Sequence, residues 1–160
     1  MLVLGLDPGA TTGWCLYDTE AKRVVEAGKF RGVEYSSEMS AAVSRAKAVV
    51  VEKPVAYGPT RPDVVECAWV AGILWHRFGS EFMTRREVKQ ILTDATNRDV
   101  RVVDDASAWA ALVLLHGEGC DAKPSKKNGP GGSIGRVTSH ERAALALVVA
   151  WAMHAGVWKP

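Results

Sequence analysis

The chain has 160 residues, of which 48% are hydrophobic and 24% are charged, as in an ordinary globular protein that is long enough to bury a substantial core. The formal net charge of +2 is too small to decide whether the partner is a nucleic acid, so the distribution of charge has to decide it. Three scattered cysteines argue against a disulfide framework, and the absence of an apolar run of about 18–20 residues argues against a membrane span. We therefore expect a cytoplasmic protein. The length predicts one domain over residues 1–160.

Hydrophobic patterning predicts three strands, a helix, a strand, a helix, a strand and then further helices. The expected strands cover residues 2–7, 14–18, 23–30, 48–52 and 81–83, and the expected helices cover 39–46, 63–78, 85–92, 106–115 and 139–155. Short connections between the first three strands favour antiparallel hairpins. The continuous β-branched run at 49–51 is typical of a strand covered on both faces. These elements predict an α/β fold, with a mixed five-stranded sheet of three antiparallel strands then parallel strands, flanked by helices.

Two segments between these elements are predicted to be loops. Residues 55–62 contain two prolines and a glycine, and we expect them to be exposed. Residues 117–136 are rich in glycine, proline and lysine, and we expect them to be flexible and basic and not to pack on the core. A loop of that length inside a small domain usually has a function or is disordered.

Two carboxylates end apolar strands. Asp7 ends the first strand and Glu52 ends the run at 48–51. Ligands of open α/β sheets bind at the carboxyl ends of the strands, and the element order predicts that these two strands are neighbours. Close carboxylates repel each other, and a divalent cation such as Mg²⁺, which prefers oxygen ligands, removes that penalty. The alternative is that each carboxylate only marks the solvent boundary of its strand.

His140 and Glu141 open the last helix, so they could lie over the same edge of the sheet. A histidine there could ligate a metal ion or act as a base. The alternative is an exposed histidine beside a glutamate whose charge is favourable in the first turn.

Four segments in this order resemble RuvC-type Holliday junction resolvases of the RNase H-like superfamily. The strand 2–7 with Pro8-Gly9 and Thr12-Gly13 resembles the start of that family, and residues 49–52 resemble its second acidic strand. Residues 87–93 resemble its lysine-bearing segment, and residues 139–147 are similar to its last helix. The correspondence spans the whole chain and implies a single RNase H-like nuclease domain.

The resemblance implies a site for two Mg²⁺ ions, with Mn²⁺ as the alternative, that hydrolyses phosphodiesters in four-way DNA junctions. Its metal ligands would be Asp7, Glu52, His140 and residue 143, and Lys89 would contact the region of the scissile phosphate. Without the resemblance, we would expect Lys89 to be an ordinary solvated lysine on a helix.

Position 143 departs from the family pattern, because it is Ala where an Asp is expected. Residues 140 and 143 are three apart and share a helix face, whereas Glu141 lies about 100° around the helix and is a poorer substitute ligand. Ala143 could be a deliberate replacement that traps substrate, the mark of a natural non-cleaving binder, or a loss that Glu141 offsets. We favour the first, because the other site residues are intact; a native coding sequence with Ala here would contradict it.

Basic side chains offer contacts to DNA phosphates, although an ordinary solvated surface is the alternative. The candidate DNA-binding residues are Tyr57, Arg61, Arg85, Arg86, Lys89, Lys123, Lys126, Lys127 and Arg136. Tyr57 is a candidate for stacking on an exposed base. A four-way junction needs two sites, which predicts a homodimer. The helix at 63–78 has apolar residues on more than one face, so it could form the interface or simply be core.

Other functions remain open at this stage. Residues 7–13 also resemble the phosphate loop of actin-like ATPases and sugar kinases, but those proteins need far more chain. A YqgF-like RNA-processing nuclease fits the last helix and the basic loop less well. The alternative from a different class is a branched-DNA-binding protein without catalysis.

Overall fold

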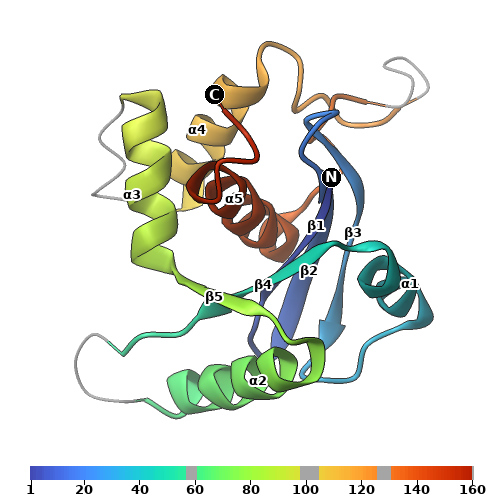
Figure 1. The fold of residues 1–160 in the computed structure, drawn as a ribbon, viewed down its shortest axis with the longest axis vertical. Helices are drawn as coiled ribbons and strands as arrows, with labels where there is room; N and C mark the ends of the chain where they lie inside the picture. Colours follow the sequence, from blue (N-terminus) through green and yellow to red (C-terminus); the bar gives the residue numbers. More distant parts are fainter. Residues whose placement is uncertain (57–60, 98–104, 126–130, 160) are drawn as a thin grey trace.

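The computed structural model describes residues 1–56, 61–97, 105–125 and 131–159 (Figure 1). The strands are β1 (Leu2–Asp7), β2 (Thr11–Asp18), β3 (Arg23–Arg31), β4 (Ala48–Lys53) and β5 (Glu81–Thr84). The helices are α1 (Ser37–Arg45), α2 (Pro62–Phe78), α3 (Arg85–Thr96), α4 (Asp105–His116) and α5 (Ser139–His154). None of these helices, in the part of the chain that is described, is long and apolar enough to cross a membrane.

The five strands form one mixed sheet in the order β3-β2-β1-β4-β5. β1 pairs antiparallel with β2, and β2 pairs antiparallel with β3. β1 pairs parallel with β4, and β4 pairs parallel with β5. The predicted fold class and the predicted adjacency of β1 and β4 are therefore confirmed.

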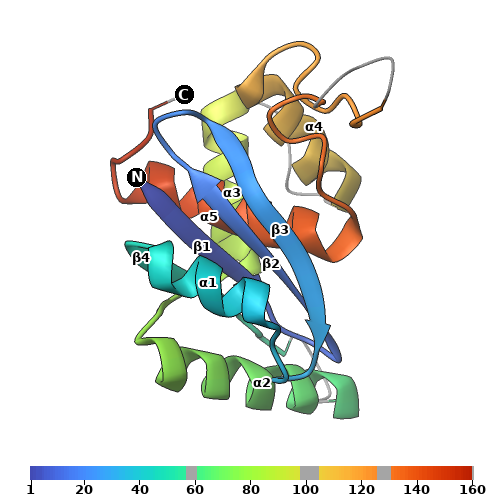
Figure 2. The same cartoon turned by 90° about the vertical axis from the view of Figure 1, so that its right-hand side faces the viewer.

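Side chains of β1 alternate between two apolar layers, one on each face of the sheet. Leu4 and Leu6 lie in the layer that α1 and α2 cover, whereas Val3 lies in the layer that α3, α4 and α5 cover. Figures 1 and 2 show the sheet between these two groups of helices, with α5 running across the second face. Helices thus cover both faces of the sheet, as predicted.

Two glycines let α5 lie directly on β1 and β2. A Cβ atom at Gly5 would lie 2.4 Å from the carbonyl oxygen of Ala144, and one at Gly13 would lie 2.4 Å from that of His140. Such contacts are too short for any side chain, so only glycine allows the helix to approach this closely. The start of α5 is thereby fixed beside the strand end that carries Asp7.

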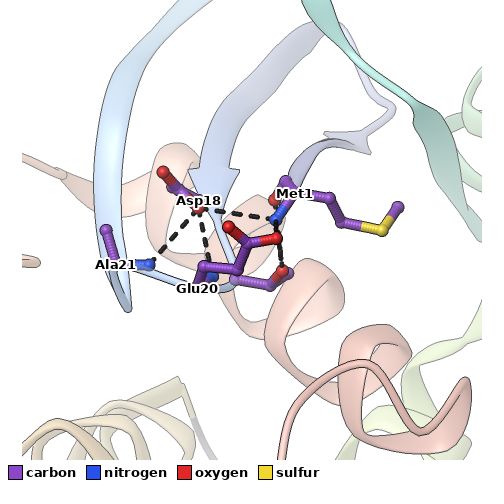
Figure 3. A network of polar contacts seen from close by, with 5 residues as sticks. Met1, Asp18, Glu20 and Ala21 are labelled. Atoms are coloured by element: carbon purple, nitrogen blue, oxygen red, sulfur yellow. Dashed lines mark hydrogen bonds and ion pairs between the residues drawn. The ribbon is translucent and has the colours of Figure 1, made fainter.

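The start of β1 is held by the turn between β2 and β3 (Figure 3). The amino group of Met1 lies 3.0 Å from Glu20 Oε1 and 3.6 Å from Asp18 Oδ1, and it donates a hydrogen bond to Thr19 Oγ1. Asp18 Oδ1 also accepts hydrogen bonds from the backbone amides of Glu20 and Ala21. These contacts keep β1 in register with β2 at the end of the sheet opposite to Asp7.

The second strand begins earlier than the sequence indicates. Thr11 pairs with Arg31, and Thr12 Oγ1 donates a hydrogen bond to Gly32 O at 3.0 Å. The interpretation of residues 9–13 as a connecting turn is therefore wrong from Thr11 onward. Two glycines and two threonines suggested a turn, but pairing with β3 outweighs that local preference.

The prediction that residues 117–136 do not pack on the core is wrong for part of this segment. Cys120 and Ile134 are buried in the layer under α3, α4 and α5. Ile134 N donates to Cys120 O at 2.9 Å, and Val24 N of β3 donates to Ser133 O at 2.8 Å. The segment therefore closes one end of the core, while residues 126–130 lie outside the described residues.

Candidate functional site

Asp7 and Glu52 lie at the ends of neighbouring parallel strands, on the same edge of the sheet. Leu6 pairs with Val51, so Asp7 and Glu52 are the next residues along β1 and β4. Because Leu6 and Val51 both lie in the layer under α1 and α2, strand alternation directs both carboxylates toward the opposite face, where α5 lies.

The first turn of α5 adds two of the predicted site positions to this edge. Asp7, His140 and Ala143 line one cavity of about 730 Å³, which we call the Asp7 cavity. Residues 140 and 143 are three apart, and both face this cavity, as the helix period predicts. Ala143 contributes only a methyl group at the position where the family resemblance implies a carboxylate.

A second, smaller cavity adjoins the first, and we call it the Glu52 cavity. Glu52 and Lys89 line it. It shares four lining residues with the Asp7 cavity, namely Arg85, Trp109, Arg142 and Ala143. The predicted residues Asp7, Glu52, Lys89, His140 and Ala143 are therefore gathered on two adjoining cavities.

The start of α3 sets Arg85 beside Glu52. Thr84 ends β5 and caps α3, with Glu87 N donating to Thr84 Oγ1 at 3.2 Å and Thr84 N donating to Glu87 Oε2 at 2.6 Å. The hydrogen bonds from Thr84 hold the pKa of Glu87 below its usual value. Arg85 Nη1 then lies 3.5 Å from Glu52 Oε1, whose side chain is only 14% exposed. Lys89 follows one helical turn later.

Glu141 is engaged elsewhere and does not replace the missing carboxylate. It is buried, and its Oε2 accepts hydrogen bonds from Thr138 N and from Thr138 Oγ1 at the start of α5. It lines neither of the two cavities. The suggestion that Glu141 ligates a metal ion is therefore not supported, and the capping role explains why this residue is a glutamate.

Among the other residues that line the cavities are Cys67, Trp109 and Arg142, none of which was a predicted site residue. Cys67 of α2 lines the Asp7 cavity, and burial, followed by the negative charge of Asp7, raises the pKa of its thiol. Trp109 of α4 and Arg142 of α5 line both cavities, with Arg142 Cζ lying 4.2 Å from the centroid of the Trp109 ring. Of these, only Arg142 lies in a segment that the resemblance covers, residues 139–147.

Most of the other predicted DNA-binding residues that are described lie away from the two cavities. Arg61 pairs with Asp63 at 3.8 Å, and both side chains are strongly exposed. Arg86 and Lys123 are exposed, and Arg136 lies over β3, where it lines separate grooves. Tyr57, Lys126 and Lys127 lie outside the described residues, so the stacking of Tyr57 on a base and the contacts of the two lysines with DNA stay predictions.

The described residues do not fit a centre for two Mg²⁺ or Mn²⁺ ions. Ala143 supplies no donor atom, and one of the two remaining carboxylates, Glu52, is paired with Arg85. Within the described ranges, no three His, Cys, Asp or Glu side chains come close enough together to hold a metal ion. The residues thus lack the clustered oxygen ligands that such ions prefer.

Comparisons with known proteins find a likeness in structure. No protein-family model and no curated protein matches the chain. A solved structure of Thermus thermophilus RuvC superposes with a TM-score of 0.55 at 18% identity, covering 100% of this chain and 99% of that one. A second solved structure is that of T. thermophilus RuvC in complex with a Holliday junction substrate. It superposes with a TM-score of 0.54 at 17% identity, covering 98% of this chain and 96% of that one. The chain therefore has a RuvC-like, RNase H-like fold.

Proposed function

We propose that this chain binds branched DNA, four-way junctions in particular, at the sheet edge that carries Asp7 and Glu52, and that it does not cut the DNA because residue 143 is alanine. The observation that carries the proposal is the gathering of Asp7, Glu52, His140 and Ala143 on two adjoining cavities of a RuvC-like fold. One of the similar structures is a RuvC protein bound to a Holliday junction substrate.

Positive charge at this edge supports a DNA partner. Arg85, Lys89 and Arg142 line the two cavities. Most of the affinity of proteins for DNA comes from such cations, which meet phosphates and release counterions. The exposed residues Arg61, Arg86, Lys123 and Arg136 stay candidates for further contacts with the DNA backbone away from the two cavities.

Junction preference is the first expected result. The chain should bind a four-way junction at least about ten-fold more tightly than a linear duplex of the same length and base composition, a difference of about 1.4 kcal/mol. Fluorescence anisotropy with both DNAs at one fixed salt concentration measures it. Equal affinities for the two DNAs contradict the proposed function.

The homodimer is part of the same proposal. A four-way junction presents two equivalent strands to be held, and a two-fold pair of subunits matches that symmetry. α2 buries Val70 and Leu74, yet it leaves Val65 57% and Trp69 63% exposed on another face. Large apolar side chains grouped at the surface in this way are typical of interfaces. We propose that two copies pair along this exposed face of α2.

Replacing Trp69 with lysine should convert the dimer into a monomer, because a charge in the middle of an apolar interface has no partner. Light scattering coupled to size-exclusion chromatography measures the mass. Trp75→Lys is the matched control: Trp75 is also exposed, but it stacks on Phe82 at 5.7 Å and lies on a different face of α2. A parent chain that stays monomeric at concentrations at which it binds junctions contradicts the pairing.

A further inference from the structure

A guanidinium group is fixed at the wall that the two cavities share. Arg142 lies in the first turn of α5, and its Cζ is 4.2 Å from the centroid of the Trp109 ring. A guanidinium over an indole face is attracted to it, and the contact restricts the otherwise flexible arginine side chain. Trp109 itself packs against the core under α3, α4 and α5. The positive charge is therefore held in one place before any ligand arrives.

One donor of this guanidinium lacks an acceptor. Arg142 Nε is buried, and it has no hydrogen-bond partner among the described residues. A buried donor left unsatisfied costs about 1–3 kcal/mol, and more where the group is charged. Over the same described ranges, the other buried polar side-chain atoms without a partner are in Ser80 and Trp158, neither of which lines these cavities. The unpartnered donor therefore belongs to a residue of the candidate site.

The charge around Arg142 favours an anion. Three cations line the two cavities, Arg85, Lys89 and Arg142, against the two carboxylates Asp7 and Glu52. Glu52 is already paired with Arg85 at 3.5 Å. Next along the chain from Arg142, Ala143 adds no negative charge. Where the family resemblance implies bound cations, this chain holds a fixed cation of its own.

We propose that Arg142, held on Trp109, binds a phosphodiester group of the DNA backbone at the wall between the Asp7 and Glu52 cavities. This inference rests on the proposed function and names the contact that holds the DNA there. The planar guanidinium can donate two parallel N–H groups to two oxygens of one phosphate, which makes arginine a strong phosphate ligand. The phosphate meets the guanidinium from the cavity side, and Trp109 removes much of the ordering cost of the arginine.

The test replaces Arg142 by methionine and by lysine in the full chain and measures binding to a four-way junction, in EDTA, at several salt concentrations. Arg142→Met should weaken binding by about ten-fold and lower the slope of log affinity against log salt by about one, because one phosphate contact is lost. Arg142→Lys should keep the slope but lose part of the affinity, since a lysine has neither the planar fork nor the stacking. Arg23→Met is the matched control, because Arg23 is exposed and lies opposite Asp18 in the pairing of β2 with β3, at the far end of the sheet.

Each result decides the matter. A parent chain that binds junctions only when Mg²⁺ is present overturns the inference, as does an equal effect of Arg142→Met and Arg23→Met. If Arg142→Met melts at a much lower temperature than the parent, the affinity of Arg142→Lys for the junction becomes the test. An affinity of Arg142→Lys equal to that of the parent then overturns the inference. If the parent prefers the junction and Arg142→Met binds it as tightly as the parent does, only the role of Arg142 is contradicted. If the parent binds junction and duplex equally, the proposed function itself is contradicted.

Discussion

The Ala143→Asp variant should cut four-way junctions when Mg²⁺ is added, at least about a hundred-fold faster than the parent chain, the scale on which single active-site groups change turnover. Ala143 lines both cavities, one of them together with Asp7 and the other together with Glu52. The change adds a third carboxylate to this edge, on the helix face that also carries His140. A set of clustered oxygen ligands is what Mg²⁺ requires. Denaturing gels of an end-labelled junction measure the cleavage.

Two further variants make this result specific. Ala143→Asn has nearly the same shape as Ala143→Asp but no negative charge, and it should stay inactive. Adding Asp7→Asn to Ala143→Asp should abolish the new activity, because Asp7 lines the same cavity. If Ala143→Asp binds junctions but does not cut them, the site differs from that of a nuclease at more than one position. The pairing of Arg85 with Glu52 and the charge of Arg142 would then be the remaining differences.

The order of the elements was predictable from the sequence because apolar residues recur with different periods in strands and in helices. The run that ends at Asp7 and the run that ends at Glu52 are buried on both faces, and the structure has them as parallel neighbours. Local capping agrees with these boundaries: Thr84 caps α3, and Thr138 is the cap of α5. Local chemistry and burial agree at these places, which is why the prediction succeeded there.

The packing of residues 117–136 was not predictable from composition. Glycine, proline and lysine suggested an unpacked loop, yet Gly132 and Gly135 pack so closely on the backbone around Cys120 and Ala122 that a Cβ at either position would clash. The glycines there serve close approach rather than flexibility. Composition alone does not separate these two uses, because both require the same residue.

The composition of the site was predictable only in part, because it depends on which way helices face. The resemblance indicated Asp7, Glu52, His140 and residue 143, all of which line the two cavities. Trp109 was not indicated, because α4 is apolar on all sides and its sequence does not show which face meets α5. The pairing of Arg142 with Trp109 joins two helices that are far apart in sequence. The feature that most distinguishes this site therefore appears only in the folded chain.

Replacing Gly5 by alanine should have the largest effect on stability. A Cβ at Gly5 would lie 2.4 Å from Ala144 O and 2.4 Å from Val148 Cγ2, so α5 has to move away from β1. Overpacking of this kind costs about 1–3 kcal/mol in the free energy of unfolding. Urea denaturation followed by circular dichroism measures that free energy, and an unchanged slope with urea shows that the transition stays two-state.

Gly72→Ala is the matched control, with the same change of one methyl group. Gly72 lies within α2, and a Cβ there would meet no atom within 4 Å. That variant should be more stable than the parent by about 0.5–1 kcal/mol, because glycine inside a helix is unfavourable relative to alanine. Gly5→Ala should also weaken junction binding at temperatures at which it stays folded, since α5 carries His140, Arg142 and Ala143 to the Asp7 edge. Parental stability in Gly5→Ala would show that α5 does not rest on β1 as closely as described, and the geometry of the site would then need a different cause.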